Sequence, residues 1–119
     1  MTLSSSLTHD RPAIVVWLDH WHALIARSQL GRQDVTVVER DVEPEEEYLR
    51  RVARATSDCD RLVILGPDDE RLAFDREYEE LYSPSDRFIE VDACVTATPS
   101  ELLDRLRFLD GSWLLPPGW

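Results

Sequence analysis

The apolar run AIVVWL at Ala13–Leu18 constrains the fold more than any other feature of the sequence. It is rich in β-branched residues and has no polar residue at alternate positions, which is typical of a strand buried on both faces. A second short run of this kind, RLVILG, occupies Arg61–Gly66. Both runs are therefore predicted to be interior strands of one sheet.

Periodicity predicts the elements around these two strands. The first run should continue through strands at His22–Ser28 and Val35–Arg40, joined by a hairpin loop over Leu30–Asp34. A helix of about 13 residues should follow, with Pro44 in its first turn and Glu45–Glu47 near the positive end of its dipole. Its apolar side comprises Tyr48, Leu49, Val52, Ala53 and Ala55. On its solvent-exposed side, Glu46 can pair with Arg50, and Glu47 can pair with Arg51.

The second half of the chain has clearer signals for where its helices begin and end. Asp68 or Asp69 is expected to cap a helix that Pro84 ends, with a core side made of Leu72, Phe74, Tyr78 and Leu81. A strand is predicted at Phe88–Val91. The sequence Thr98-Pro99-Ser100-Glu101 is a capping box that opens a last helix ending at Gly111, whose apolar side comprises Leu102, Leu103, Leu106 and Leu109.

These elements predict a single α/β domain over residues 12–111, between a disordered polar tail at 1–11 and an apolar tail at 112–119. The element order is β-β-β-α-β-α-β-α. With the first strand in the centre and right-handed crossovers, it gives one mixed five-stranded sheet of order 3-2-1-4-5, the ribonuclease-H-like arrangement.

Charge and composition exclude several classes of protein. The formal net charge is -11, with 24 acidic residues against 13 basic residues, all of them Arg, so non-specific binding to DNA or RNA is disfavoured. No apolar run approaches the roughly 20 residues of a membrane span, and the N-terminus lacks the pattern of a secretory signal. We therefore expect a cytoplasmic protein. Cys59 and Cys94 form no CxxC or Cys/His cluster, so neither a disulfide framework nor a structural zinc site is predicted.

Three stretches resemble a known family. They are VVWLDHWHALIARS from Val15, LVILGPDDERLAF from Leu62 and VDACVTATPSELLDRLRFL from Val91. In order and spacing they resemble short bacterial release-factor-like proteins of the translational machinery. Those proteins are similar to the central domain of the archaeo-eukaryotic peptide-chain release factor and of its ribosome-rescue relative, pelota. The resemblance implies a non-enzymatic accessory protein that binds the ribosome or a translation factor.

The chain also departs from that family. Its turn at Gly66–Arg71 carries three acids where the family has small and basic residues, Thr96-Ala97 replaces an Asp-His pair, and Phe108-Leu109 replaces an aromatic pair. The sequence contains no Gly-Gly-Gln motif. In true release factors, the loop with this motif hydrolyses peptidyl-tRNA. The resemblance therefore implies a protein without peptide-release activity.

Acidic residues suggest one alternative function. Asp19 follows the first strand, and Asp68 and Asp69 follow the fourth, so they should meet at the carboxyl edge of the sheet, with Glu45–Glu47 as a further source of ligands. Carboxylates so placed hold Mg²⁺ in divalent-metal-dependent nucleases. The competing interpretation makes Asp19 a turn residue and Asp68 or Asp69 a helix cap. We favour the second interpretation, which predicts no metal and no cofactor.

Other candidate sites are weaker. His20 and His22 would share one sheet face if both lay in the strand, a spacing that binds transition metals, but no third ligand is evident and His20 is expected in a turn. No GxSxG, GxGxxG or GxxxxGK[ST] motif occurs, so no catalytic residue is predicted.

Partner binding has two candidate surfaces. Arg50, Arg51 and Arg54, with Arg61, either contact phosphate groups of RNA or form a solvated face neutralised by Glu46 and Glu47. Trp113 in the apolar tail either covers the sheet or docks on another subunit. Because the strand at Val35–Arg40 should be a sheet edge, we predict a homodimer formed through that edge, the tail or both.

Overall fold

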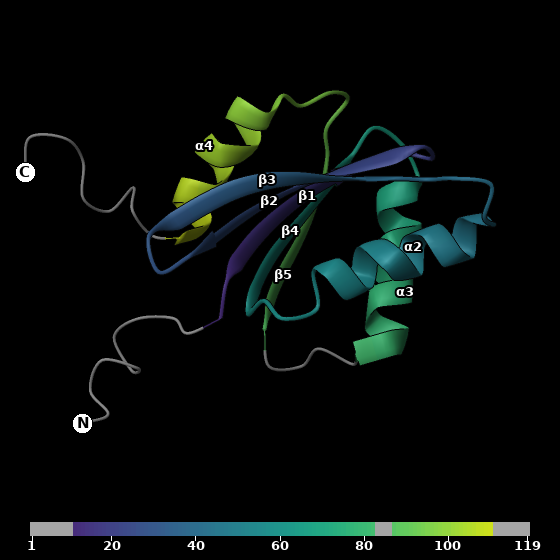
Figure 1. Cartoon of the computed structure of the whole chain (residues 1–119), viewed down its shortest axis with the longest axis horizontal. Coiled ribbons are helices and arrows are strands. Elements are labelled where there is room, and N and C mark those ends of the chain that lie inside the picture. The colour runs from purple at the N-terminus through teal and green to yellow at the C-terminus, as the bar shows by residue number, and fades with distance from the viewer. Residues whose placement is uncertain (1–10, 83–86, 111–119) are drawn as a thin grey trace, which may run out of the picture.

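A mixed five-stranded sheet forms the centre of the protein in the computed structural model, which describes residues 11–82 and 87–110. The strands are β1 (Ala13–Leu18), β2 (His22–Gln29), β3 (Arg32–Glu39), β4 (Arg61–Gly66) and β5 (Phe88–Ala93). Their order is β3-β2-β1-β4-β5. β1 pairs antiparallel with β2 and parallel with β4, and β4 pairs parallel with β5. The predicted order, with the first strand in the centre, is confirmed (Figure 1).

Helices cover both faces of this sheet (Figure 1). α2 (Glu45–Ala55) and α3 (Glu70–Tyr82) lie on one face, and α4 (Pro99–Asp110) lies on the other. Alternate residues of β1 point into the two resulting cores: Ile14, Val16 and Leu18 face α2 and α3, whereas Ala13, Val15 and Trp17 face α4. Burial on both faces explains why this strand is continuously apolar. Among the described residues, no helix is long and apolar enough to cross a membrane.

The hairpin between β2 and β3 is tighter than predicted. Instead of a loop over Leu30–Asp34, the connection is a turn at Leu30 and Gly31, whose φ angles of 53° and 82° are both positive. Two positive φ angles match the right-handed twist of the flanking strands. The polar residues after Gly31 belong to β3, which is an exposed edge strand and therefore carries no apolar signal there.

The inner face of α3 also differs from the prediction. Phe74 and Tyr78 are buried as expected, but Leu72 and Leu81 are 41% and 44% exposed, and Glu70 is buried instead. The buried row therefore runs through positions 70, 74 and 78, which lie one helical turn apart. The Tyr78 hydroxyl fixes this row by donating a hydrogen bond to the carbonyl of Thr56 at 3.1 Å.

Helix boundaries are close to those expected. In α4, the backbone N–H of Glu101 donates to Thr98 Oγ1 and that of Thr98 donates to Glu101 Oε1, so the capping box is confirmed. Pro44 lies one position before α2 and not in its first turn. Ala55 is exposed although it was assigned to the apolar side of α2. Pro84, Gly111, residues 1–10 of the predicted polar tail and the whole predicted apolar tail at 112–119, with Trp113, lie outside the described residues.

Candidate functional site

The turn after β1 is built around the side chain of Asp19. Its Oδ1 accepts hydrogen bonds from the backbone N–H groups of Trp21 at 2.8 Å and His22 at 2.9 Å. Such self-contained turns occupy the carboxylate with the backbone of its own loop. Asp19 therefore stands where the turn interpretation places it, and His20 lies outside strand β2 with its ring directed toward the helices.

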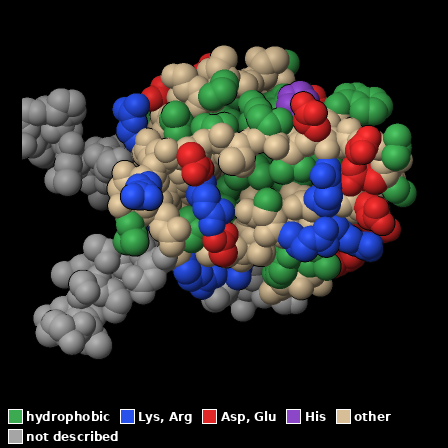
Figure 2. Space-filling model, in the orientation of Figure 1, with side chains coloured by type: hydrophobic (Ala, Val, Ile, Leu, Met, Phe, Trp, Pro, Cys, Tyr) green, Lys and Arg blue, Asp and Glu red, His purple; other side chains and the backbone are tan. Residues whose placement is uncertain are grey.

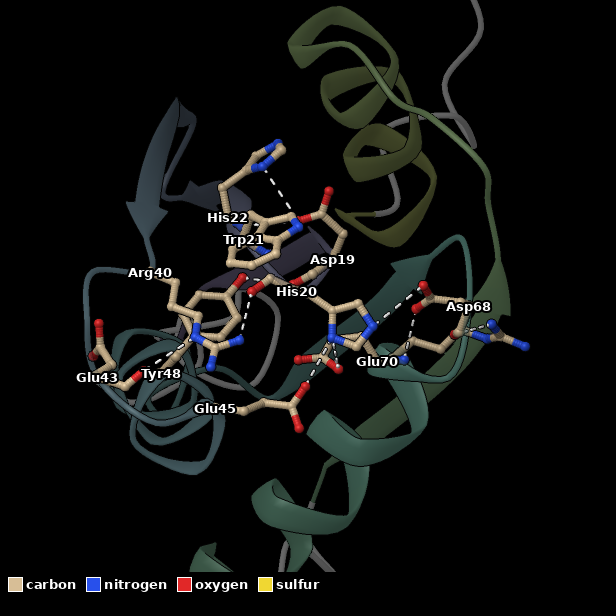
Figure 3. Close-up of polar contacts among 11 residues, drawn as sticks. Asp19, His20, Trp21, His22, Arg40, Glu43, Glu45, Tyr48, Asp68 and Glu70 are labelled. Carbon is tan, nitrogen blue, oxygen red and sulfur yellow. Dashed lines mark hydrogen bonds and ion pairs between the residues drawn. The ribbon is translucent and has the colours of Figure 1, made fainter.

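His20 meets acidic side chains from two other elements (Figure 3). Its Nδ1 lies 2.9 Å from Glu45 Oε2 and 3.1 Å from Glu70 Oε1, and its Nε2 lies 3.6 Å from Asp68 Oδ2. Glu45 is the first residue of α2 and Glu70 is the first residue of α3. The group, which we call the His20 cluster (His20, Glu45, Asp68 and Glu70), thus lies at the carboxyl ends of β1 and β4, where α/β sheets place their ligand sites.

Close packing of the backbone brings these elements together. A Cβ on Gly66, at the end of β4, would lie 2.6 Å from the carbonyl oxygen of Leu18, so glycine allows the ends of β4 and β1 to approach. On the other side, the buried Tyr48 of α2 donates a hydrogen bond from its hydroxyl to the carbonyl of Asp19 at 3.0 Å. Arg40 donates to the carbonyls of His20 at 3.3 Å and Glu43 at 3.2 Å. The turn is therefore anchored from both α2 and the segment before it.

The electrostatics of the cluster are dominated by Glu70. Its side chain is 2% exposed, and burial, reinforced by Glu45 beside it, raises its pKa to about 7. The hydrogen bond to Glu45 raises the pKa of His20, and hydrogen bonds from Glu70 and His20 lower the pKa of Glu45. The shifts of Glu70 and His20 favour their protonated forms, whereas that of Glu45 favours its ionised form. Glu70 Oε2 is buried and has no hydrogen-bond partner among the described residues.

The structure brings together only part of the predicted acidic site. Asp68 borders His20 and also caps α3, since its Oδ1 accepts from the N–H of Glu70 at 3.0 Å. Asp69 is exposed, and its carbonyl accepts the N–H groups of Leu72 and Ala73 in the first turn of α3. The three atoms best placed to share an ion belong to His20, Glu45 and Glu70, which lie within 4.8 Å of one another.

Sequence reasoning missed this grouping for a specific reason. It paired His20 with His22, but the ring of His22 packs 5.4 Å from that of Trp17, and its Nδ1 lies 3.4 Å from Asp19 Oδ1. Glu45–Glu47 are predicted together as a further source of acidic ligands, whereas no ligand role is predicted for Glu70. The sequence feature that could have indicated the site is the position of the two acids, because Glu45 and Glu70 each begin a helix at the same edge of the sheet.

The predicted basic surface on α2 is largely paired with acids. Arg50 bonds to Glu77 at 3.0 Å and lies 3.5 Å from Glu46. Arg51 lies 2.8 Å from Glu43 and not against Glu47 as predicted, whereas Arg54 is exposed. Arg61 is on a different surface, where it donates to the carbonyl of Leu109 at 3.0 Å. On the face seen in Figure 2, basic and acidic side chains are interspersed.

A separate groove of about 440 Å³ lies where the β4–β5 side of the sheet meets α4. Phe88 and Phe108, both largely exposed, contribute to its lining together with Arg105. Arg105 is held there by Glu90 at 2.8 Å and by Asp92. The groove shares no residue with the His20 cluster.

The fold is shared with proteins of translation. The structure is similar to Pelota from Archaeoglobus fulgidus, with a TM-score of 0.64 at 12% identity over 92% of this chain and 35% of that one. It is similar to Dom34 from Saccharomyces cerevisiae, a translation termination-like factor, with a TM-score of 0.59 at 12% identity over 97% of this chain and 36% of that one. A model of ribosome-bound archaeal Pelota and ABCE1 gives 0.58 at 13% identity over 93% and 36%.

These likenesses confirm the predicted resemblance to Pelota at the level of the fold. The chain spans about a third of the length of the structures it matches. No protein-family model matches the sequence, and no curated protein matches it.

Proposed function

We propose that this protein is a cytoplasmic accessory factor of translation that binds the ribosome or a translation partner. The observation that carries the proposal is the match of at least 92% of the chain to one region of Pelota and Dom34. One of the matched Pelota structures is described as ribosome-bound, and Dom34 is described as interacting with Hbs1. The three sequence stretches that resemble release-factor-like proteins support the same role independently of the fold comparison.

We further propose that the protein does not release peptides. Its four glycines are Gly31, Gly66, Gly111 and Gly118, so no Gly-Gly-Gln sequence occurs. In true release factors, that loop carries the hydrolysis of peptidyl-tRNA. The proposed activity is therefore binding without hydrolysis of peptidyl-tRNA.

The proposed contact surface is the outer side of α2, through Arg50, Arg51 and Arg54. Arg50 and Arg51 already have carboxylate partners, so RNA phosphates would compete with Glu77 and Glu43 for them. Arg54 is exposed in the last turn of the helix and is therefore the principal candidate for a phosphate contact. Because the chain is acidic as a whole, binding must depend on this local surface rather than on net charge.

Sedimentation from cell lysate tests the proposal. The full-length protein should co-sediment with ribosomes or with a translation factor at physiological salt, and it should release no peptide from ribosomes that carry peptidyl-tRNA. Recovery of the protein entirely in fractions free of ribosomes and translation factors would contradict the binding function. Peptide release at a rate above that of a buffer control would contradict the second part of the proposal.

A further inference from the structure

We propose that His20, Glu45 and Glu70 form a binding site for a divalent transition-metal ion such as Zn²⁺ or Mn²⁺. The three side chains converge from the turn after β1 and from the first residues of α2 and α3 (Figure 3). One imidazole nitrogen and two carboxylates are a donor set that suits these ions, whereas Mg²⁺ favours oxygen ligands alone. The site does not depend on the proposed role in translation.

The spacing of the donor atoms fits an ion of this kind. His20 Nδ1 is 2.9 Å from Glu45 Oε2 and 3.1 Å from Glu70 Oε1. Metal–ligand bonds of about 2.0–2.2 Å at tetrahedral or octahedral angles separate neighbouring ligand atoms by roughly 3 Å. Small movements of these side chains would therefore create a coordination shell. His20 and Glu45 are about half exposed, which leaves a path for the ion to enter.

The buried oxygen of Glu70 is a second and independent indication of a ligand. Glu70 is 2% exposed, and its Oε2 has no hydrogen-bond partner in the described part of the chain. A buried carboxylate oxygen without a partner is costly, because it has lost its water without replacement. The Oε1 atom of the same carboxylate lies 3.1 Å from His20 Nδ1, so a cation held by His20, Glu45 and Glu70 would balance the charge of this buried side chain.

The surroundings support this assignment. Asp68 Oδ2 lies 3.6 Å from His20 Nε2, the ring nitrogen that faces away from Glu45 and Glu70. Metal-binding histidines commonly direct their second nitrogen to a carboxylate, which orients the ring. Glu45, Glu70 and Asp68 together face one imidazole, and the nearby Arg40 is committed to the carbonyls of His20 and Glu43. A divalent cation would balance this local excess of acid.

Titration of the full chain with Zn²⁺ and Mn²⁺ tests the site. After treatment with EDTA and removal of the chelator, calorimetry should show one ion per chain with an affinity in the micromolar range. His20→Asn and Glu70→Gln should each weaken binding by at least about 100-fold, and Asp68→Asn by about 10-fold, because it only orients the ring. His22→Asn and Glu46→Gln are matched controls from just outside the site and should change the affinity less than about twofold.

Two spectroscopic measurements separate loss of the metal site from misfolding of a variant. Circular dichroism checks each variant, and Glu45→Gln replaces any that fails to fold. In the unaltered protein, ¹⁵N NMR of the imidazoles should show Zn²⁺ on Nδ1 of His20. Absence of binding at millimolar Zn²⁺ and Mn²⁺, coordination elsewhere, or an affinity indifferent to His20→Asn and Glu70→Gln would overturn the proposal.

Discussion

Glu70 shows how far one residue can depart from its sequence environment. It stands in a run of acidic residues at the start of a helix, where a carboxylate is normally solvated. In the fold it is nearly fully buried between α2 and the turn after β1, and it retains its proton to about pH 7. The charge of this residue at the start of α3 therefore changes near neutral pH.

The stability of the metal-free protein should fall as the pH rises from 5 to 8. The pKa of Glu70 is raised from 4.5 to about 7, so the folded state holds a proton that the unfolded state loses across that window. The raised pKa of His20 acts in the same direction above pH 6.5, whereas the lowered pKa of Glu45 adds stability that is lost only in more acidic solution.

Glu70→Gln isolates this effect, because glutamine mimics the protonated acid. Thermal unfolding in EDTA should show a Tm that declines less between pH 5 and pH 8 than that of the unaltered protein. At pH 8 the variant should be at least as stable as the unaltered chain. A variant with the same decline in Tm as the unaltered protein would show that Glu70 is ionised across the window.

Asp19 should matter for stability and not for metal affinity. Asp19→Ala removes the acceptor of two backbone N–H groups and should cost about 1–2 kcal/mol of unfolding free energy, and Asp19→Asn should cost less because its amide oxygen still accepts. Denaturant unfolding measures both. If Asp19→Asn abolished Zn²⁺ or Mn²⁺ binding while leaving stability unchanged, the turn role would be wrong and the nuclease-like alternative would be favoured.

At the scale of elements, the contact between the ends of β1 and β4 holds the site together. Gly66→Ala should be destabilising by about 2 kcal/mol, because the added methyl would lie 2.6 Å from a backbone oxygen that cannot easily move. Gly31→Asn is a suitable control, since asparagine tolerates the positive φ of that turn. Equal and small losses of Tm in both variants would refute the close packing.

The elements were largely predictable because their signals are local or depend on burial alone. The continuous apolar runs of β1 and β4 identified interior strands, and the capping box fixed the start of α4. The hairpin turn was not predictable, because Leu30 rarely adopts a positive φ. Nor was the inner face of α3, where tertiary contacts of Tyr78 select Glu70 over Leu72.

The His20 cluster illustrates the same limit for functional sites. The prediction that residues after β1 and β4 meet at one sheet edge brought Asp68 to the correct place. The turn held by Asp19 and the packing of α2 decide which side chains point inward there. Residue spacing predicts neither of these features. His20 and Glu45 were both noted but not joined, because they lie 25 positions apart.

For the whole molecule, we propose a homodimer formed through the edge strand β3, the tail at 112–119 or both. β3 is an edge of the sheet, and its Val37 is 54% exposed. Such edges offer unpaired backbone groups to another chain. The tail, with Trp113, lies outside the described residues and enters this proposal from its apolar sequence.

Light scattering across a concentration series measures the association. Val37→Lys should weaken a β3 interface about tenfold, with the exposed Val42→Lys as the control. Deletion of 112–119 should weaken association if the tail forms the interface. If the tail instead packs on its own core, the deletion should lower Tm equally at every protein concentration. A full-length protein that stays monomeric at high concentration would contradict the dimer.

Binding of the purified protein to purified ribosomes tests the central claim most directly. The account predicts saturable binding at physiological salt that weakens as salt is raised and that Arg54→Glu reduces at least about fivefold. Arg32→Glu, an exposed charge reversal on the β2–β3 hairpin, should leave binding unchanged. Absence of saturable binding to ribosomes or to any purified translation factor, with the protein folded, would contradict a role in translation.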